Sequence, residues 1–174
     1  MQPVSGLKSL ALAQLCIVVD DADKYAARYA KLFGIPIPPP HLTDDFTETR
    51  ATYNCQPTEA KARVYVWQFG DVDFELLQPL GPGSVWHDWL MEHGPSVHHV
   101  ALRATDTDGV VKEFARFGHK VLQRGFFTDR FPDGGHTGVY TYISTPPKTS
   151  APPSNCSKTM TPKENPADGR SLSQ

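Results

Sequence analysis

The sequence contains one pattern twice, as LCIVVDDADKYAARYAKLFG at residues 15–34 and as VALRATDTDGVVKEFARFG at residues 100–118. Each copy opens with a short, largely apolar run that is typical of a buried strand. An aspartate pair follows, then apolar residues at helical spacing, and both copies end on Phe-Gly. With one residue of slack, Asp21 aligns with Asp106, so the pattern predicts an internal duplication.

The segments that follow each copy extend the repeat into a unit of one strand, one helix and three further strands. Residues 69–72 (Phe-Gly-Asp-Val) supply a tight turn between two of these strands, and Ser84 begins a short helix between the units. The expected fold class is therefore α+β, with paired βαβββ modules that form an open, curved, mixed sheet. The further strands are expected at 46–53, 62–69, 72–78, 119–126 and 137–144, and the connecting helix at 85–93.

Length and composition favour a single globular domain. The chain has 174 residues, of which 39% are hydrophobic and 21% charged, and its formal net charge is −2. This charge gives no reason to expect nucleic-acid binding. No apolar run is long enough to span a membrane, and we expect a cytoplasmic location. The domain is expected at 11–147, with modules at about 11–80 and 97–147, between a flexible lead-in (1–10) and a disordered tail (148–174) that is poor in apolar side chains.

Three polar side chains occupy strand positions where they can converge. The repeat places Gln14 and His99 at equivalent points of the two first strands. Glu75 lies in the middle of the segment DFELLQP, and a carboxylate among apolar residues is costly unless it is paired or bound to a cation. An amide oxygen, a carboxylate and an imidazole brought together would form a site for a divalent metal.

Two segments resemble the vicinal oxygen chelate superfamily (glyoxalase, bleomycin resistance and dioxygenase proteins), and most closely its methylmalonyl-CoA epimerase-like branch. They are KARVYVWQFGDVDFELLQPLG at residues 61–81 and HGPSVHHVALRATD at residues 93–106. The resemblance covers about residues 11–146 and implies paired βαβββ modules around a metal. It also implies Gln14, Glu75 and His99 as metal ligands; epimerases have a histidine where this chain has Gln14.

The C-terminal segment departs from the family pattern. Both the resemblance and the repeat require a final strand carrying a glutamate equivalent to Glu75, but the segment after Pro147 has no strand pattern. Glu164 is the one glutamate there, and no β signal surrounds it. The final strand and its ligand are therefore expected to be missing. The two neutral ligands and one carboxylate that remain would leave a bound divalent cation positively charged, so we expect weak metal binding.

Each candidate ligand has a structural alternative. His99 can be a buried, hydrogen-bonded core histidine, and the Gln14 amide can hydrogen-bond to a neighbouring backbone group. Glu75 can instead be paired with Arg63 or Arg103. The neighbouring His98 is expected to point to the opposite face of its strand in a structural role. Cys16, with no visible base nearby, is interpreted as a small apolar filler.

Four aromatic residues are candidates for substrate binding, since they alternate along two strands. They can form the wall of a pocket for a mostly apolar carbonyl compound, or they can simply pack in the core. These residues are Tyr65, Trp67, Tyr140 and Tyr142.

The resemblance implies a metal-dependent isomerase, epimerase or lyase that acts on a small carbonyl compound through a metal-stabilised enolate. The strand at 62–69 offers no acidic residue as a base, and the resemblance to glyoxalases implies Glu75 as the candidate catalytic proton shuttle. The alternative is a metal-free binding or accessory protein of the same fold. A ring-cleaving dioxygenase would require two histidines and one glutamate around iron, and Gln14 argues against it. A homodimer is left open, because an unpaired strand edge can pair with a second chain.

Overall fold

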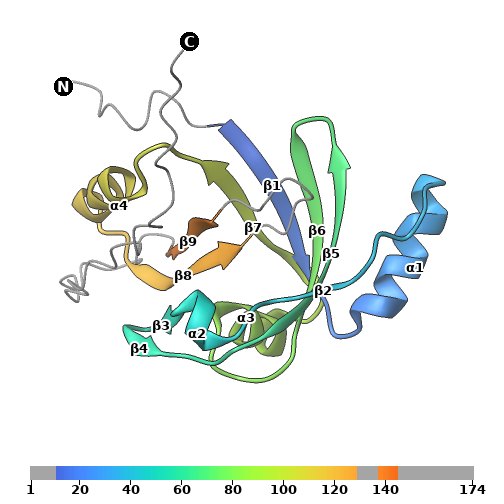
Figure 1. Ribbon diagram of the computed structural model, residues 1–174, viewed down its shortest axis with the longest axis horizontal. Helices are drawn as coiled ribbons and strands as arrows, with labels where there is room; N and C mark the ends of the chain where they lie inside the picture. Colours follow the sequence, from blue (N-terminus) through green and yellow to red (C-terminus); the bar gives the residue numbers. More distant parts are fainter. Residues whose placement is uncertain (1–10, 129–136, 145–174) are drawn as a thin grey trace, which may run out of the picture.

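The structure, a computed structural model, describes residues 11–128 and 137–144 (Figure 1). Its strands form two open sheets, and the helices pack against them. The class is α+β, as the repeat predicts. The expected lead-in (1–10), the expected tail (148–174) and the segment after Ser144, where the final strand is expected to be missing, lie outside the described residues. None of the helices described combines the length and apolarity that crossing a lipid bilayer requires.

The larger sheet joins the two repeats through their first strands. β1 (Ala11–Val18) is parallel to β6 (Val72–Pro79) of its own module and antiparallel to β7 (Ser96–Arg103) of the next. The two remaining strands are β5 (Ala62–Phe69), which pairs with β6 across a tight turn at Gly70 (φ 63°), and the short β2 (His41–Leu42). Their order across the sheet is β2-β5-β6-β1-β7.

The smaller sheet has the order β4-β3-β8-β9. Its long strands, β8 (Val121–Thr128) and β9 (Thr137–Ile143), belong to the second repeat. The short β3 (Thr52–Tyr53) and β4 (Gln56–Pro57) come from the first, and β3 pairs with β8. The two repeats therefore meet in both sheets.

The prediction of a continuous strand at 46–53 is wrong for its first half. Residues Phe46–Thr49 form a single helical turn, α2, after Asp45. Local bonds explain this turn: the backbone nitrogens of Glu48 and Thr49 both donate to the Asp45 carbonyl, at 3.0 and 2.9 Å. Arg50 then adopts a left-handed conformation (φ 44°), which ends the turn before β3.

Helix α1 (Ala22–Phe33) covers one face of the larger sheet. The Asp21 side chain caps it by accepting from Lys24 N at 3.0 Å, and Gly34 ends it in the left-handed conformation (φ 70°). Small side chains on its inner side (Ala22, Ala26 and Ala30) let it lie close to the sheet. The core under α1 also contains Val19, Tyr65, Trp67 and Leu76.

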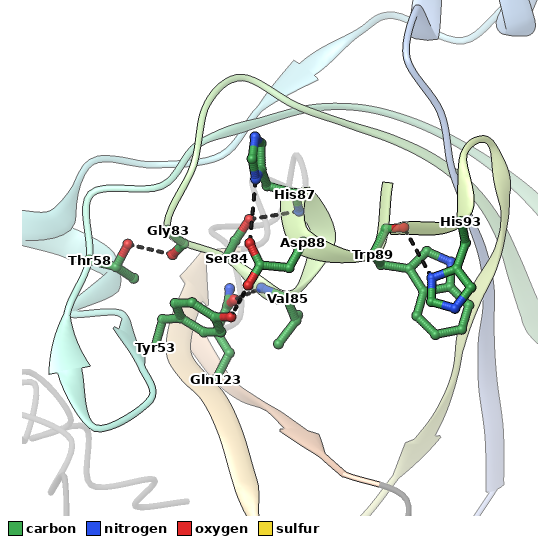
Figure 2. A network of polar contacts seen from close by, with 10 residues as sticks. All are labelled: Tyr53, Thr58, Gly83, Ser84, Val85, His87, Asp88, Trp89, His93 and Gln123. Atoms are coloured by element: carbon green, nitrogen blue, oxygen red, sulfur yellow. Dashed lines mark hydrogen bonds and ion pairs between the residues drawn. The ribbon is translucent and has the colours of Figure 1, made fainter. Parts of the chain in front are cut away.

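Helix α3 (Val85–His93) and the smaller sheet cover the opposite face, and polar contacts fix the start of α3 (Figure 2). The Ser84 hydroxyl accepts from the His87 backbone nitrogen at 3.1 Å, so Ser84 caps the helix that the sequence predicts to begin there. The buried Gln123 of β8 accepts from Val85 N at 2.9 Å, and Tyr53 donates to Asp88. Sheet and helix are therefore tied together.

Strand β7 has one pairing partner within the described part of the chain, and so does β9. By the symmetry of the repeat, a strand equivalent to β6 would lie between them. The outward side chains of β7 are about half exposed, at 53% for Val97, 56% for Val100 and 50% for Leu102. Helix α4 (Thr107–Arg116) contacts β9 but leaves these side chains uncovered.

Candidate metal centre

Glu75, Cys16 and His99 form a row across three neighbouring strands of the larger sheet, β6, β1 and the edge strand β7. Cys16 on β1 is paired in register with Glu75 on β6 and with His99 on β7. Neighbouring strands lie about 4.8 Å apart, so three paired residues with side chains on one face have their functional atoms close together. One ligand atom of each lies within 4.8 Å of the others. The row is buried: Cys16 is 0% and Glu75 6% exposed.

Gln14 lies on β1 two residues before Cys16 and extends this row. Residues two apart on a strand share a face, so Gln14 and Cys16 point the same way. Gln14 Oε1 lies 3.2 Å from His99 Nε2, and the same nitrogen lies 4.0 Å from Glu75 Oε2. The structure thus brings together all three side chains that the sequence identified as candidate ligands.

The position of His98 differs from the expectation. A β-bulge interrupts the pairing of β1 and β7: Cys16 faces His99, but Ile17 faces Val97, so His98 is an extra residue. A bulge cancels the strict alternation of side chains, and both histidines turn toward the same side. Their Nδ1 atoms lie 2.8 Å apart.

This contact connects His99 to the start of α3. Burial lowers the pKa of His98 to about 4, and a hydrogen bond to the Val85 backbone opposes that change. A backbone group that favours the charged imidazole is an acceptor, so His98 donates to the Val85 carbonyl. Since Nδ1 faces His99, we assign this donation to His98 Nε2. His98 Nδ1 then accepts from His99 Nδ1, and His99 Nε2 carries the lone pair that faces Gln14 and Glu75.

Electrostatics make the metal-free row neutral or nearly so. Burial raises the pKa of the Glu75 carboxyl from 4.5 to about 7; the charge of Asp73 raises it too, while a hydrogen bond from Cys16 lowers it. Burial, together with the neighbouring His98, lowers the pKa of His99 to about 3, so its imidazole is neutral. Burial and the Glu75 charge raise the pKa of the Cys16 thiol.

The alternative pairing of Glu75 with Arg63 is excluded by the geometry. The Arg63 guanidinium binds both carboxylate oxygens of Asp23, at 2.9 and 2.8 Å, on the side of the sheet that faces α1. No contact between Arg103 and Glu75 occurs within residues 11–128 and 137–144 either. The carboxylate of Glu75 therefore has the Cys16 thiol and the His99 imidazole beside it, and no arginine from the part of the chain that the structure describes.

The four aromatic candidates divide between the two faces. Tyr65 and Trp67, each 6% exposed, lie under α1; Tyr65 donates to Asp23 at 2.5 Å and Trp67 Nε1 to the Pro36 carbonyl at 3.0 Å. The structure does not bring this pair to the row, and core packing describes their surroundings.

Tyr142 and Tyr140 lie on the same face as the row. The Tyr142 ring centroid is 5.0 Å from that of His99 and 5.7 Å from that of His98. Tyr140 lies two residues before Tyr142 on β9, with 5.8 Å between the two ring centroids, and packs near Trp86. Of the four aromatic candidates, Tyr142 is the one in ring contact with a candidate ligand.

The donor set fits a divalent cation. A buried carboxylate, an imidazole nitrogen with an inward lone pair, an amide oxygen and a thiol converge on one small volume, and this mixture suits borderline metals such as zinc and cobalt. The unprotonated His99 Nε2 and Gln14 Oε1 are both acceptors in the assigned tautomer, and a cation between them would relieve their repulsion.

Two members of the site were missed by sequence reasoning. Cys16 is expected as filler, although alternation along its strand, the signal that the sequence offers, places it on the same face as Gln14. His98 was assigned to the opposite face because a bulge leaves no simple mark in the sequence.

The site can be compared with known proteins. A family model described as Glyoxalase/Bleomycin resistance protein/Dioxygenase superfamily matches residues 13–138. Among curated proteins none matches the chain. A solved hypothetical protein of Bacillus halodurans C-125 has 16% identity and a TM-score of 0.50, over 82% of this chain and 98% of its own.

Two methylmalonyl-CoA epimerases are also among the similar solved structures. The enzyme of Mycobacterium tuberculosis has 18% identity and a TM-score of 0.47, over 73% of this chain and 83% of its own. That of Streptomyces coelicolor, a variant in complex with 2-nitronate-propionyl-CoA, has the same identity and TM-score, over 67% and 83%.

Proposed function

The chain belongs to the glyoxalase/bleomycin resistance protein/dioxygenase superfamily, and from this premise we propose that it is a metal-dependent isomerase, epimerase or lyase acting on a small carbonyl compound. The substrate would have two neighbouring oxygens and an acidic carbon–hydrogen bond between or beside them. A homodimer is part of the proposal, since β7 presents an edge without a partner among the described strands.

The observation that carries the proposal is the convergence of Gln14, Glu75 and His99 on one buried face. His99 Nε2 lies 3.2 Å from Gln14 Oε1 and 4.0 Å from Glu75 Oε2. Side chains from three separate strands meet there, and no cationic side chain within the described segments neutralises Glu75.

Each residue has a distinct task in the proposed reaction. A divalent cation held by Gln14, Glu75 and His99 would supply Lewis-acid stabilisation of negative charge on the substrate oxygens. Glu75 accepts the proton from the acidic carbon and returns it. The Tyr142 ring, beside that of His99, would limit access of water to the developing charge.

Metal content tests the ligand assignment. Purified wild-type protein is expected to retain or take up one equivalent of Zn²⁺ or Co²⁺, and His99→Ala is expected to abolish stoichiometric binding while keeping its circular dichroism spectrum. His87→Ala is the matched control, because His87 lies at the start of α3 and contacts Asp88 instead of the row. Equal metal content in wild type and His99→Ala would remove the assignment.

A metal-free binding protein is the second candidate, and one observation favours it. Without a cation, Glu75 already has a hydrogen-bond partner in Cys16, and its raised pKa of about 7 keeps much of the buried carboxyl neutral. Exchange of a substrate α-proton with deuterium distinguishes the two candidate functions. It is followed by NMR, with and without metal, on a panel of α-hydroxy and 1,3-dicarbonyl compounds. Exchange that requires metal and Glu75 supports the enzyme, while ligand binding without metal or exchange supports the binding protein.

A further inference from the structure

We propose that Cys16 supplies a thiolate ligand to the cation held by Gln14, Glu75 and His99, and that the site therefore prefers Zn²⁺ or Co²⁺ to Mg²⁺ or Mn²⁺. This inference rests on the proposed function, because it requires that a metal binds at this row. It adds a fourth protein ligand that neither the repeat nor the family pattern requires.

The position of Cys16 carries the inference. It is the central residue of the row, paired with Glu75 on one side and with His99 on the other. Its sulfur, a Glu75 oxygen and a His99 nitrogen lie within 4.8 Å of one another. A cation bound by both neighbours would thus lie next to the sulfur.

Charge balance gives a second argument. Gln14 and His99 are neutral ligands, so Glu75 alone would leave a divalent cation with a net positive charge. Cys16 is 0% exposed and Glu75 6%, and an uncompensated charge is costly in such a place. A bound thiol loses its proton, and the resulting thiolate together with the Glu75 carboxylate neutralises the cation. Cys16 would thereby take the role of the anionic ligand that the family pattern places on a final strand.

The sulfur also sets the choice of metal. Thiolates favour zinc, cobalt and other borderline or soft ions, whereas magnesium and manganese favour sites made of oxygen atoms. Loss of the sulfur should therefore weaken the binding of Zn²⁺ and Co²⁺ much more than that of Mn²⁺.

Cobalt substitution provides the test. Wild-type protein is loaded with Co²⁺, and its absorption spectrum is recorded in the visible region, where the metal's own bands report binding, and in the near ultraviolet, where a sulfur-to-cobalt charge-transfer band reports a thiolate ligand. We expect both. Cys16→Ser, whose hydroxyl can still bond Glu75, should lose the charge-transfer band and bind Co²⁺ at least about 10-fold more weakly. Its affinity for Mn²⁺ should change by less than about threefold.

The control is a Cys55→Ser/Cys156→Ser double variant, in which Cys16 is the one cysteine left; this variant also removes the disulfide in which Cys55 takes part. It should keep the charge-transfer band. Visible cobalt bands without the charge-transfer band in wild type would overturn the role of Cys16 and leave the proposed function standing. Failure of the wild type to bind Co²⁺ would overturn both. A band that survives Cys16→Ser but disappears in the double variant would also overturn the assignment. Because the first reading uses wild-type protein, it holds even if Cys16→Ser fails to fold.

Discussion

The Nδ1 atoms of His98 and His99 lie 2.8 Å apart, although the two residues are neighbours on one strand. Regular alternation would send their side chains to opposite faces, and the bulge in the pairing with β1 prevents this. The contact fixes which nitrogen of His99 faces Glu75, because His98 is itself hydrogen-bonded to the Val85 backbone. Two successive hydrogen bonds therefore orient the candidate ligand His99: one joins it to His98, and the other joins His98 to the Val85 backbone at the start of α3.

The first prediction concerns these two hydrogen bonds of His98. His98→Phe keeps a ring beside Trp89 and Tyr142 but removes the nitrogen that accepts from His99. We expect the affinity for Zn²⁺ or Co²⁺ to fall by about 10–100-fold, the usual effect of losing a residue that orients a metal ligand. Isothermal titration calorimetry measures it. His93→Phe, which preserves stacking on Trp89, is the control and should bind metal as the wild type does. Equal affinities for the two variants would contradict the orientation.

The second prediction separates the two faces of the larger sheet. Trp67 is 6% exposed, packs near Phe33 and Phe74, and donates to the Pro36 carbonyl. Trp67→Ala should lower the free energy of unfolding by about 3–5 kcal/mol, as for other buried large-to-small changes. Denaturation by urea measures this loss. Metal affinity of the folded fraction should stay unchanged, and a large loss of affinity with normal stability would place Trp67 in the site after all.

The third prediction concerns the attachment of α3. Gln123 is 1% exposed and accepts from Val85 N at 2.9 Å, so Gln123→Leu leaves a buried N–H group without its partner. We expect a loss of about 1–3 kcal/mol in the free energy of unfolding. Gln68→Leu, at an exposed position of β5, is the control for the same chemical change. Similar losses in both variants would show that the Val85 contact contributes little.

Much of the fold was predictable because local signals agree with the tertiary structure. The caps at Asp21 and Ser84 and the stop at Gly34 mark helix ends through bonds made within a few residues. Alternation correctly placed Gln14 and Cys16 on one face. The repeat placed His99 opposite Gln14; the two side chains are close, but the register pairs His99 with Cys16 and Gln14 with Ala101. The helical turn at 46–49 was missed because its short, mixed sequence fits strand and helix equally well.

The missing parts of the site depend on pairing between distant strands. Nothing within β1 states that Cys16 will face Glu75 on one side and His99 on the other, since register is set by the whole sheet. For the same reason Tyr65 and Tyr142 look alike in sequence, although the first lies under α1 and the second beside His99.

The last prediction concerns the pH dependence of stability in the metal-free protein. The pKa of Glu75 is about 7 in the folded chain, raised by burial, against an ordinary value of 4.5. A raised pKa means that folding favours the protonated carboxyl, so this stabilisation is fully present below pH 4.5 and is lost as the pH rises through 7. The difference between 4.5 and about 7 corresponds to about 3 kcal/mol.

Glu75→Gln mimics the protonated carboxyl and cannot ionise, so it isolates this effect. With a chelator present, wild type and Glu75→Gln should differ by under about 1 kcal/mol in unfolding free energy at pH 5, and the variant should be more stable by about 3 kcal/mol at pH 8. The lowered pKa values of His98 and His99 act in both proteins and cancel in the comparison. Glu92→Gln, at an exposed position of α3, is the control for the substitution itself.

Adding Zn²⁺ at pH 8 should reverse the order of stability of wild type and Glu75→Gln, because a cation that binds the Glu75 carboxylate stabilises only the wild type strongly. Equal stabilities at pH 8 without metal would mean that Glu75 is ionised at little cost, and an unreversed order with Zn²⁺ would mean that it is not a ligand.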